Sequence, residues 1–153
     1  MKNTISIKFI ALFALLLAFA CKKEVVKIKG CMDKTATNYK TDAEEDDGSC
    51  TYSGKVVFWW TQAQADNWFT TTSATEVHIW ENGTFQGKLV NTSVLTTAPA
   101  CGAVGALTII KDLGKSKTGT MIYQVRDQAN QTWHTSDTVA VTSGGCTNKS
   151  IDR

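Results

Sequence analysis

Residues that could carry acid–base catalysis are scarce in this chain. His78 and His134 are its two histidines, and histidine is the side chain that changes charge most readily near neutral pH. His134, Ser136 and Asp137 could form a Ser/His/Asp arrangement on paper, but neighbours in one strand point to opposite faces and such triads are spatial. Two histidines without a visible third ligand do not define a metal centre either. The sequence therefore predicts a protein that is not an enzyme.

A cation site is the next chemistry that the residue types suggest. Asp42, Glu44, Asp46 and Asp47 place carboxylates at short intervals, and calcium takes roughly six to eight oxygen ligands. The run Asp46-Asp47-Gly48-Ser49 lacks the full EF-hand spacing and its terminal glutamate, so a solvated acidic loop is the competing interpretation. No cofactor other than calcium is indicated.

Tryptophan side chains could form a face on which a carbohydrate stacks. The chain has five of them, and Trp68, Trp80 and Trp133 are the candidate ligand-binding residues because polar residues such as Asn67 and Gln131 lie beside them. Core packing is the default role of an indole. The two interpretations differ in whether these rings are exposed.

Residues 1–20 have the pattern of a secretory signal peptide. A short basic part carries Lys2 and Lys8, an apolar run follows from Phe9 to Ala20, and small residues come just before Cys21. The apolar run is well short of the ~20 residues that a permanent transmembrane helix needs. A cleaved leader is therefore favoured over a retained membrane span.

Cys21 ends the sequence Leu17-Ala18-Phe19-Ala20-Cys21. This arrangement resembles the bacterial lipobox, in which the cysteine thiol receives a diacylglyceryl group that carries fatty acyl chains such as palmitate, and the chain is cut before the cysteine. The resemblance implies a lipoprotein that is held to a membrane through lipid on Cys21, because two acyl chains suffice for stable anchoring. An ordinary secreted protein that begins at Cys21 is the alternative.

Residues 21–29 form a charged tether without turn chemistry. Lys22 stands where the inner-membrane retention signal of lipoproteins has an aspartate, so the resemblance favours the outer membrane of a bacterial cell envelope. Lys23-Glu24 is only faintly similar to the acidic surface-export tags of the Bacteroidota. The periplasmic and the surface face of that membrane both stay open.

The chain that follows the leader is nearly neutral. Subtracting Lys2 and Lys8 from the 16 Lys and Arg leaves 14, against 14 Asp and Glu. This balance predicts no nucleic-acid partner. The remaining length allows one modest hydrophobic core and a small appendage.

Four cysteines remain once Cys21 is assigned to lipid. In an oxidising compartment four cysteines predict two disulfides, for which three connectivities exist. Pairing Cys31 with Cys50 and Cys101 with Cys146 keeps each bridge inside one compositional segment and is the favoured connectivity. A thiolate metal site would need closely spaced ligand pairs such as Cys-x-x-Cys, and the sequence contains none.

The acidic segment between Cys31 and Cys50 is too short and polar to order itself without a disulfide, a cation or both. Gly30-Cys31-Met32-Asp33, Asn38-Tyr39 and Asp46-Asp47-Gly48-Ser49-Cys50 resemble a short cysteine module that recurs in secreted and surface proteins of the Bacteroidota. The resemblance implies a cell-envelope protein and a disulfide within the module. We place this acidic module at residues 30–52.

Residues 53–153 alternate β-branched and aromatic runs with turn residues at intervals of roughly ten, which is typical of an all-β antiparallel sandwich. Asn82-Gly83 predicts a two-residue hairpin. The expected strands are Lys55–Trp60, Glu76–Glu81, Phe85–Val90, Ala106–Lys111, Thr118–Asp127, Gln131–Thr135, Thr138–Thr142 and Cys146–Ile151.

The period of two along each strand predicts which side chains form the core. The strand Lys55–Trp60 is apolar on both faces, so we expect it to be central or covered by the loop that follows it. Gln62–Trp68 could form a short helical turn, with Trp68 and Phe69 either closing an end of the sandwich or lining a binding site. The expected core residues are Val77, Ile79, Met121, Tyr123, Val125, Val139 and Val141.

Gly54–Trp59, Cys101-Gly102, Trp133 and Gly144-Gly145-Cys146 are similar to a small sandwich domain of Bacteroidota lipoproteins, which is transthyretin-like or immunoglobulin-like. The resemblance implies an accessory module. We therefore expect a membrane-anchored envelope lipoprotein whose sandwich has a structural or protein-interaction role. Binding of a surface glycan through exposed tryptophans is the alternative.

Overall fold

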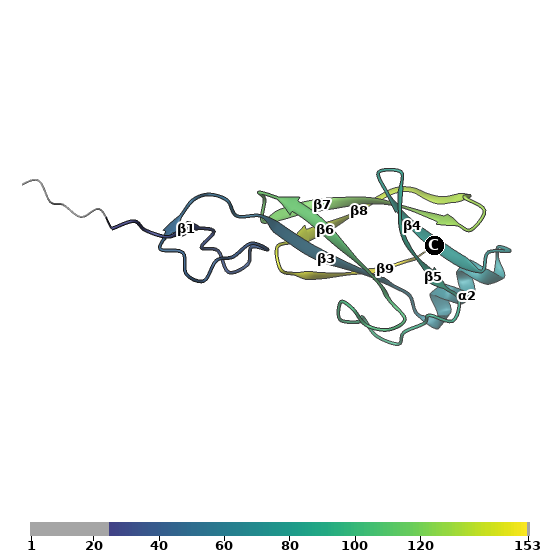
Figure 1. Cartoon of the computed structure of the whole chain (residues 1–153). Helices are drawn as coiled ribbons and strands as arrows, with labels where there is room; N and C mark the ends of the chain where they lie inside the picture. The colour runs from purple at the N-terminus through teal and green to yellow at the C-terminus, as the bar shows by residue number, and fades with distance from the viewer. Residues whose placement is uncertain (1–24, 153) are drawn as a thin grey trace, which may run out of the picture.

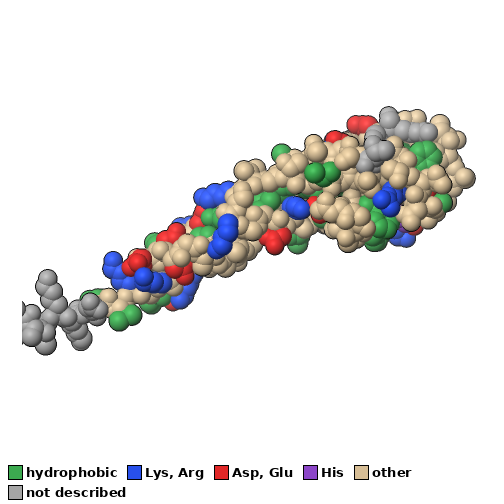
Figure 2. All heavy atoms as spheres, turned by 90° about the horizontal axis from the view of Figure 1, so that it is seen from above, with side chains coloured by type: hydrophobic (Ala, Val, Ile, Leu, Met, Phe, Trp, Pro, Cys, Tyr) green, Lys and Arg blue, Asp and Glu red, His purple; other side chains and the backbone are tan. Residues whose placement is uncertain are grey.

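The computed structural model describes residues 25–152, apart from the side chains of His134 and Thr135. The molecule is elongated, with the acidic module at one end and the sandwich at the other (Figure 1). Figure 2 shows charged side chains of both signs crowded over the narrow end. Cys21 and the expected leader lie outside the described residues.

Seven strands form the sandwich, in two sheets with the orders β6-β3-β9 and β5-β4-β7-β8. The expected all-β sandwich is therefore confirmed. The strands run over β3 (Tyr52–Trp59), β4 (Glu76–Glu81), β5 (Thr84–Val90), β6 (Leu107–Gly114), β7 (Thr118–Asp127), β8 (Thr132–Thr142) and β9 (Cys146–Ser150). In the module, the two-residue strands β1 (Lys29–Gly30) and β2 (Glu45–Asp46) pair in parallel.

Two features of this topology differ from the expected pattern. The segments Gln131–Thr135 and Thr138–Thr142 belong to the single strand β8, which follows β7 through two shifts of register. β9 pairs with β3 in parallel, so the smaller sheet is mixed rather than purely antiparallel. The period of two fixes the faces of a strand but not its direction.

The core lies between the two sheets. Every core residue expected from alternation is buried in one cluster, together with Val56, Phe58 and Trp60 from the start of the domain. Phe58 contacts Tyr123 across the layers in an edge-on arrangement, with ring centroids 4.8 Å apart. Gly54 permits close approach of β3 to β8, because a Cβ there would lie 2.4 Å from the carbonyl oxygen of Thr142.

β3 is central in its sheet and apolar on both faces, as expected. Val57 points away from the main core and is nonetheless fully buried. The covering segment belongs to residues 91–106 and not to the loop directly after β3: the Gly102 amide donates to Thr108 Oγ1 at 2.8 Å, and Thr108 lies opposite Val57 in the pairing of β3 with β6. The Cys101–Cys146 disulfide ties this segment to β9, where Cys146 lies opposite Lys55.

The single helix of the described residues, α2 (Gln62–Thr70), lies at the end of the sandwich away from the module (Figure 1). Thr61 and Gln64 form a capping box, in which each side chain bonds the backbone N–H of the other residue. Trp68 is 1% exposed, and Phe69 contacts Trp60 edge-on. These two aromatic residues thus close the end of the sandwich. Within residues 25–152, no helix has the length and apolarity to cross a membrane.

The Asn82-Gly83 hairpin between β4 and β5 is confirmed. Asn82 has φ 47° and Gly83 has φ 76°, so both residues adopt the left-handed region that this turn demands. Asparagine and glycine tolerate that region better than other residues.

Replacing Trp68 by Ala should destabilise the fold by about 3–5 kcal/mol, because the substitution removes a large buried ring and leaves a cavity. Denaturant-induced unfolding, monitored by the remaining tryptophans, measures the change. Ile110→Ala is the matched control, since Ile110 is 67% exposed, and it should change the free energy of unfolding by less than about 1 kcal/mol. Equal losses in the two variants would contradict the assignment of Trp68 to the core.

Candidate anchoring module and recognition surfaces

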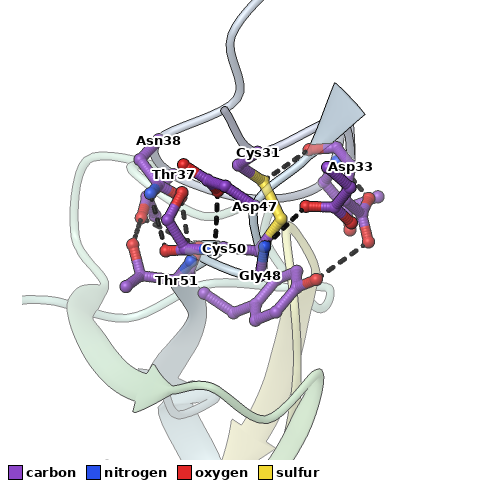
Figure 3. The surroundings of a disulfide bond; sticks show 12 residues. Cys31, Asp33, Thr37, Asn38, Asp47, Gly48, Cys50 and Thr51 are labelled. Carbon is purple, nitrogen blue, oxygen red and sulfur yellow. Dashed lines mark hydrogen bonds between the residues drawn. A yellow bond between two sulfur atoms is a disulfide. The ribbon is translucent and has the colours of Figure 1, made fainter. Parts of the chain in front are cut away.

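The Cys31–Cys50 disulfide is the centre of the acidic module (Figure 3). Its sulfurs are joined within a small buried cluster that also contains Ala36 and Tyr52. Leu113 of β6 packs against this cluster and against the main core. Both predicted disulfides are therefore present, and the first lies where the module meets the sandwich.

Side-chain hydrogen bonds replace regular secondary structure within the module. The Asn38 amide donates to the Ser49 carbonyl and its oxygen accepts from the Thr51 amide, each at 2.8 Å. The Thr37 hydroxyl lies 2.8 Å from that of Thr51. Asn38 thereby holds the start of the loop against its end, beside the disulfide (Figure 3).

The carboxylates expected as calcium ligands do not converge. Across the described residues, no group of three or more His, Cys, Asp and Glu side chains could hold a metal ion. Asp46 accepts from the Gly48 amide at 3.0 Å and Asp47 from the Ser49 amide at 2.9 Å. These two acids, together with Ser49, shape a turn, and hydrogen bonds from Ser49 lower the pKa of Asp47. Asp42 and Glu44 are exposed.

Asp33 joins the module to the sandwich. Its carboxylate accepts from the amide and hydroxyl of Thr35, at 2.9 and 2.8 Å, and from the Tyr52 hydroxyl at 3.0 Å. Lys117, which precedes β7, places its Nζ 2.5 Å from the same carboxylate. Hydrogen bonding to Lys117 and then to Thr35 holds the pKa of Asp33 far below its ordinary value. All of these hydrogen bonds favour the ionised form of Asp33.

Two further bonds cross the same boundary. Lys115 Nζ donates to the Gly48 carbonyl at 2.9 Å, and the Ser143 hydroxyl donates to the Thr35 carbonyl at 2.8 Å. Together with the packing of Leu113 against the disulfide cluster, these contacts make the module and the sandwich one body.

The candidate glycan-binding tryptophans do not form an exposed row. Trp68 is buried and contacts Trp133 edge-on, with centroids 5.8 Å apart, at the closed end of the sandwich. Trp133 and Trp80 are half-buried on different strands. The structure thus assigns Trp68 to the core and separates Trp80 from the other two candidates.

Trp80 belongs to an aromatic–arginine cluster on the outer face of the four-stranded sheet, formed by His78, Trp80, Phe85 and Arg126. The Arg126 guanidinium carbon lies 4.6 Å from the Trp80 ring centroid, within range of a cation–π interaction. Phe85 contacts Trp80 and His78 edge-on, with centroids 5.7 and 5.1 Å away. His78 Nε2 lies 2.7 Å from a Glu76 oxygen.

A small cavity of about 140 Å³ opens between the two sheets beside β9. The Tyr123 hydroxyl donates to Asp137 at 2.7 Å, and Lys149 Nζ lies 2.9 Å from the same carboxylate oxygen. Bonds from Lys149 and then from Tyr123 lower the pKa of Asp137 to about 2, while burial and then Asp137 raise that of Tyr123. Because its donors and acceptor already satisfy one another, this network ties β7 and β8 to β9.

Comparison with known proteins provides no independent guide to function. No family model, no curated protein and no solved structure matches this chain.

Sequence reasoning did not find Arg126, Lys117 or Lys149 as residues of interest. Each lies in or beside a polar stretch of strand and resembles an ordinary solvent-exposed basic residue. Their partners Trp80, Asp33 and Asp137 are distant in the sequence. Only the alternation along β7 could have indicated the position of Arg126. It places Arg126 on the outer face of the strand, whereas Met121, Tyr123 and Val125 point to the inner face.

Replacing Asp33 by Ala should loosen the module from the sandwich, because Tyr52 and Lys117 lose their shared acceptor. Amide hydrogen exchange within residues 31–50 should accelerate roughly tenfold or more, because at least one charge-assisted hydrogen bond is lost. Exchange in β4 and β7 should be unchanged. Asp42→Ala, at an exposed acid of the same module, is the control, and an equal acceleration there would contradict the role of Asp33.

Replacing Asp137 by Asn should make the free energy of unfolding depend less on pH in acid. A carboxyl whose pKa falls from 3.8 unfolded to about 2 folded stabilises the fold above about pH 4, and this stabilisation disappears as the pH falls toward 2. Wild-type protein should therefore lose more unfolding free energy than Asp137→Asn between these pH values. Denaturant titrations at several pH values measure this, with the exposed Asp42→Asn as control. Parallel pH profiles for wild type and Asp137→Asn would refute the prediction.

Proposed function

We propose that this chain is a bacterial cell-envelope lipoprotein, anchored through acyl chains on Cys21, whose sandwich is a non-enzymatic structural or protein-interaction module. The resemblance of residues 17–21 to a lipobox supports the anchor on Cys21, and Lys22, in place of the aspartate of the inner-membrane retention signal, favours the outer membrane. The resemblance of the acidic module to a cysteine module of envelope proteins supports the same proposal.

The observation that carries this proposal is the pairing of cysteines. Of the five cysteines in the sequence, Cys31 pairs with Cys50 and Cys101 pairs with Cys146. Four thiols thus satisfy one another, and Cys21 is the cysteine left over for another chemistry. Disulfides of this kind persist in oxidising compartments outside the cytoplasm.

The attachment of the sandwich to the acidic module supports a role in presenting the sandwich away from the membrane. Asp33, Lys115 and Lys117 connect the module to the sandwich through an ion pair and hydrogen bonds. The anchoring end and α2 lie at opposite ends of the elongated body (Figure 1). Such an elongated body holds its far surfaces away from the membrane.

The non-enzymatic part of the proposal is supported by the way in which polar side chains are engaged. The Glu76 carboxylate binds both His78 and Lys88, at 2.7 and 2.6 Å. Asp137 is held by Tyr123 and Lys149. These carboxylates act in ion pairs and cross-strand ties.

Glycan binding is the second candidate function. Binding of a glycan through exposed Trp68, Trp80 and Trp133 has little support, because Trp68 is buried and the other two rings are half-buried. The aromatic–arginine cluster favours glycan binding at a different set of residues, because Phe85 in this cluster is 47% exposed.

Cys21→Ser should abolish lipid attachment. In a bacterial host that acylates lipoproteins and is fed an alkyne-tagged palmitate, wild-type protein should carry the tag and sediment with membranes. The Cys21→Ser chain should carry no tag, and intact-mass measurement should show the loss of the acyl chains. Lys22→Ala serves as the control and should remain tagged; a tagged Cys21→Ser chain would end the proposal.

A further inference from the structure

We propose that the outer face of the four-stranded sheet binds an acidic polysaccharide, with Arg126 taking a sugar carboxylate and Phe85 and Trp80 forming the apolar platform for the ring. This inference rests on the glycan-binding form of the proposed function. It does not depend on lipid attachment.

Arg126 is a cation without a counter-charge in the described part of the protein. Its Nη2 donates to Gln124 at 2.6 Å, but no described carboxylate lies within ion-pair distance. Its Nε is buried and has no hydrogen-bond partner. A guanidinium binds a carboxylate through two parallel hydrogen bonds. The geometry of Arg126 is therefore complementary to a carboxylate that the described chain does not supply.

Trp80 carries a second donor without an acceptor. Its Nε1 is buried without a hydrogen-bond partner, as are the Nε1 atoms of Trp59 and Trp60, so this donor supports the site only through its position beneath the Arg126 guanidinium. Because the guanidinium lies over the indole, a carboxylate that draws Arg126 outward would also uncover the indole N–H. A hydroxyl or ring oxygen of the same sugar could then accept from it.

The platform beside these donors is apolar and accessible. Phe85 is 47% exposed, and its ring stands edge-on to Trp80 and His78. Sugar rings present C–H faces that pack on aromatic side chains as other apolar groups do. Glu76 does not repel an acidic ligand strongly, because Lys88 and His78 already bind it.

The surrounding face favours a polyhydroxylated ligand over a protein. Thr120, Thr138 and Lys88 are exposed on it, and among the described residues Phe85 and Ile122 are its exposed large apolar side chains. A specific protein interface buries roughly 800 Å² on each partner around an apolar centre. This face is too polar for such a centre but offers hydroxyl, amide and ammonium groups for hydrogen bonds.

Calorimetric titration of the purified mature protein with oligogalacturonic acid and with its methyl ester tests the proposal, because the two probes differ in their carboxylates. The acid should bind at physiological salt and the ester at least tenfold more weakly. Arg126→Gln should weaken binding of the acid roughly tenfold or more, the loss of one charge-assisted contact. Phe85→Ser, which alters an exposed ring, should weaken binding of both probes.

Lys55→Gln is the matched control, because Lys55 is an exposed cation on the other sheet. It should leave the affinity unchanged, and thermal unfolding should show that every variant is folded. If Arg126→Gln does not fold, Phe85→Ser decides the matter. The proposal is overturned by absent binding, by equal affinity for acid and ester, or by equal losses in Lys55→Gln. Binding of poly-L-glutamate with the same dependence on Arg126 would assign the site to an acidic protein segment instead and likewise overturn it.

Discussion

The Cys31–Cys50 disulfide orders a segment that has almost no hydrophobic core of its own. The buried hydrophobic residues of the module are the two cysteines, Ala36 and Tyr52, and Tyr52 is already the first residue of β3. A cluster this small cannot offset the conformational entropy of ordering the loop. The module is therefore stable only as an extension of the sandwich, with Leu113 completing its apolar contacts. Rigid attachment follows from this shortage of apolar surface.

The second disulfide meets a similar need at the other sheet. β3 is apolar on both faces, and its sheet has only three strands, so residues 91–106 must cover the side that faces away from the core. This segment has no regular secondary structure. Cys101–Cys146 restricts its freedom in the unfolded chain and fixes it to β9. Each disulfide thus stabilises an irregular segment that the sandwich needs but that could not order itself.

Much of the fold was readable from local pattern, because alternation identifies both strands and core faces. The core positions of β4, β7 and β8, the Asn82-Gly83 turn and both disulfides were all predicted correctly. Parallel pairing of β9 with β3 was not, since direction leaves no trace in a period of two. The four carboxylates considered as possible calcium ligands do not gather into one group among the described residues, and Asp46 and Asp47 accept from turn amides instead. The contacts of Asp33 with Lys117 and of Arg126 with Trp80 were not predicted, because the partners are far apart in the sequence.

The parallel pairing of β3 with β9 sets the order in which the domain can be completed. Within residues 25–152, β3 is the first long strand and β9 is the last strand, so one edge of β3 has no neighbour until residues 146–150 are made. Contacts between such distant segments are slow to form and leave apolar strands exposed meanwhile. The disulfide between Cys101 and Cys146 also cannot form until Cys146 has been synthesised. A chain that is interrupted before β9 therefore cannot close its smaller sheet. The sandwich can be completed only after this five-residue strand has been synthesised.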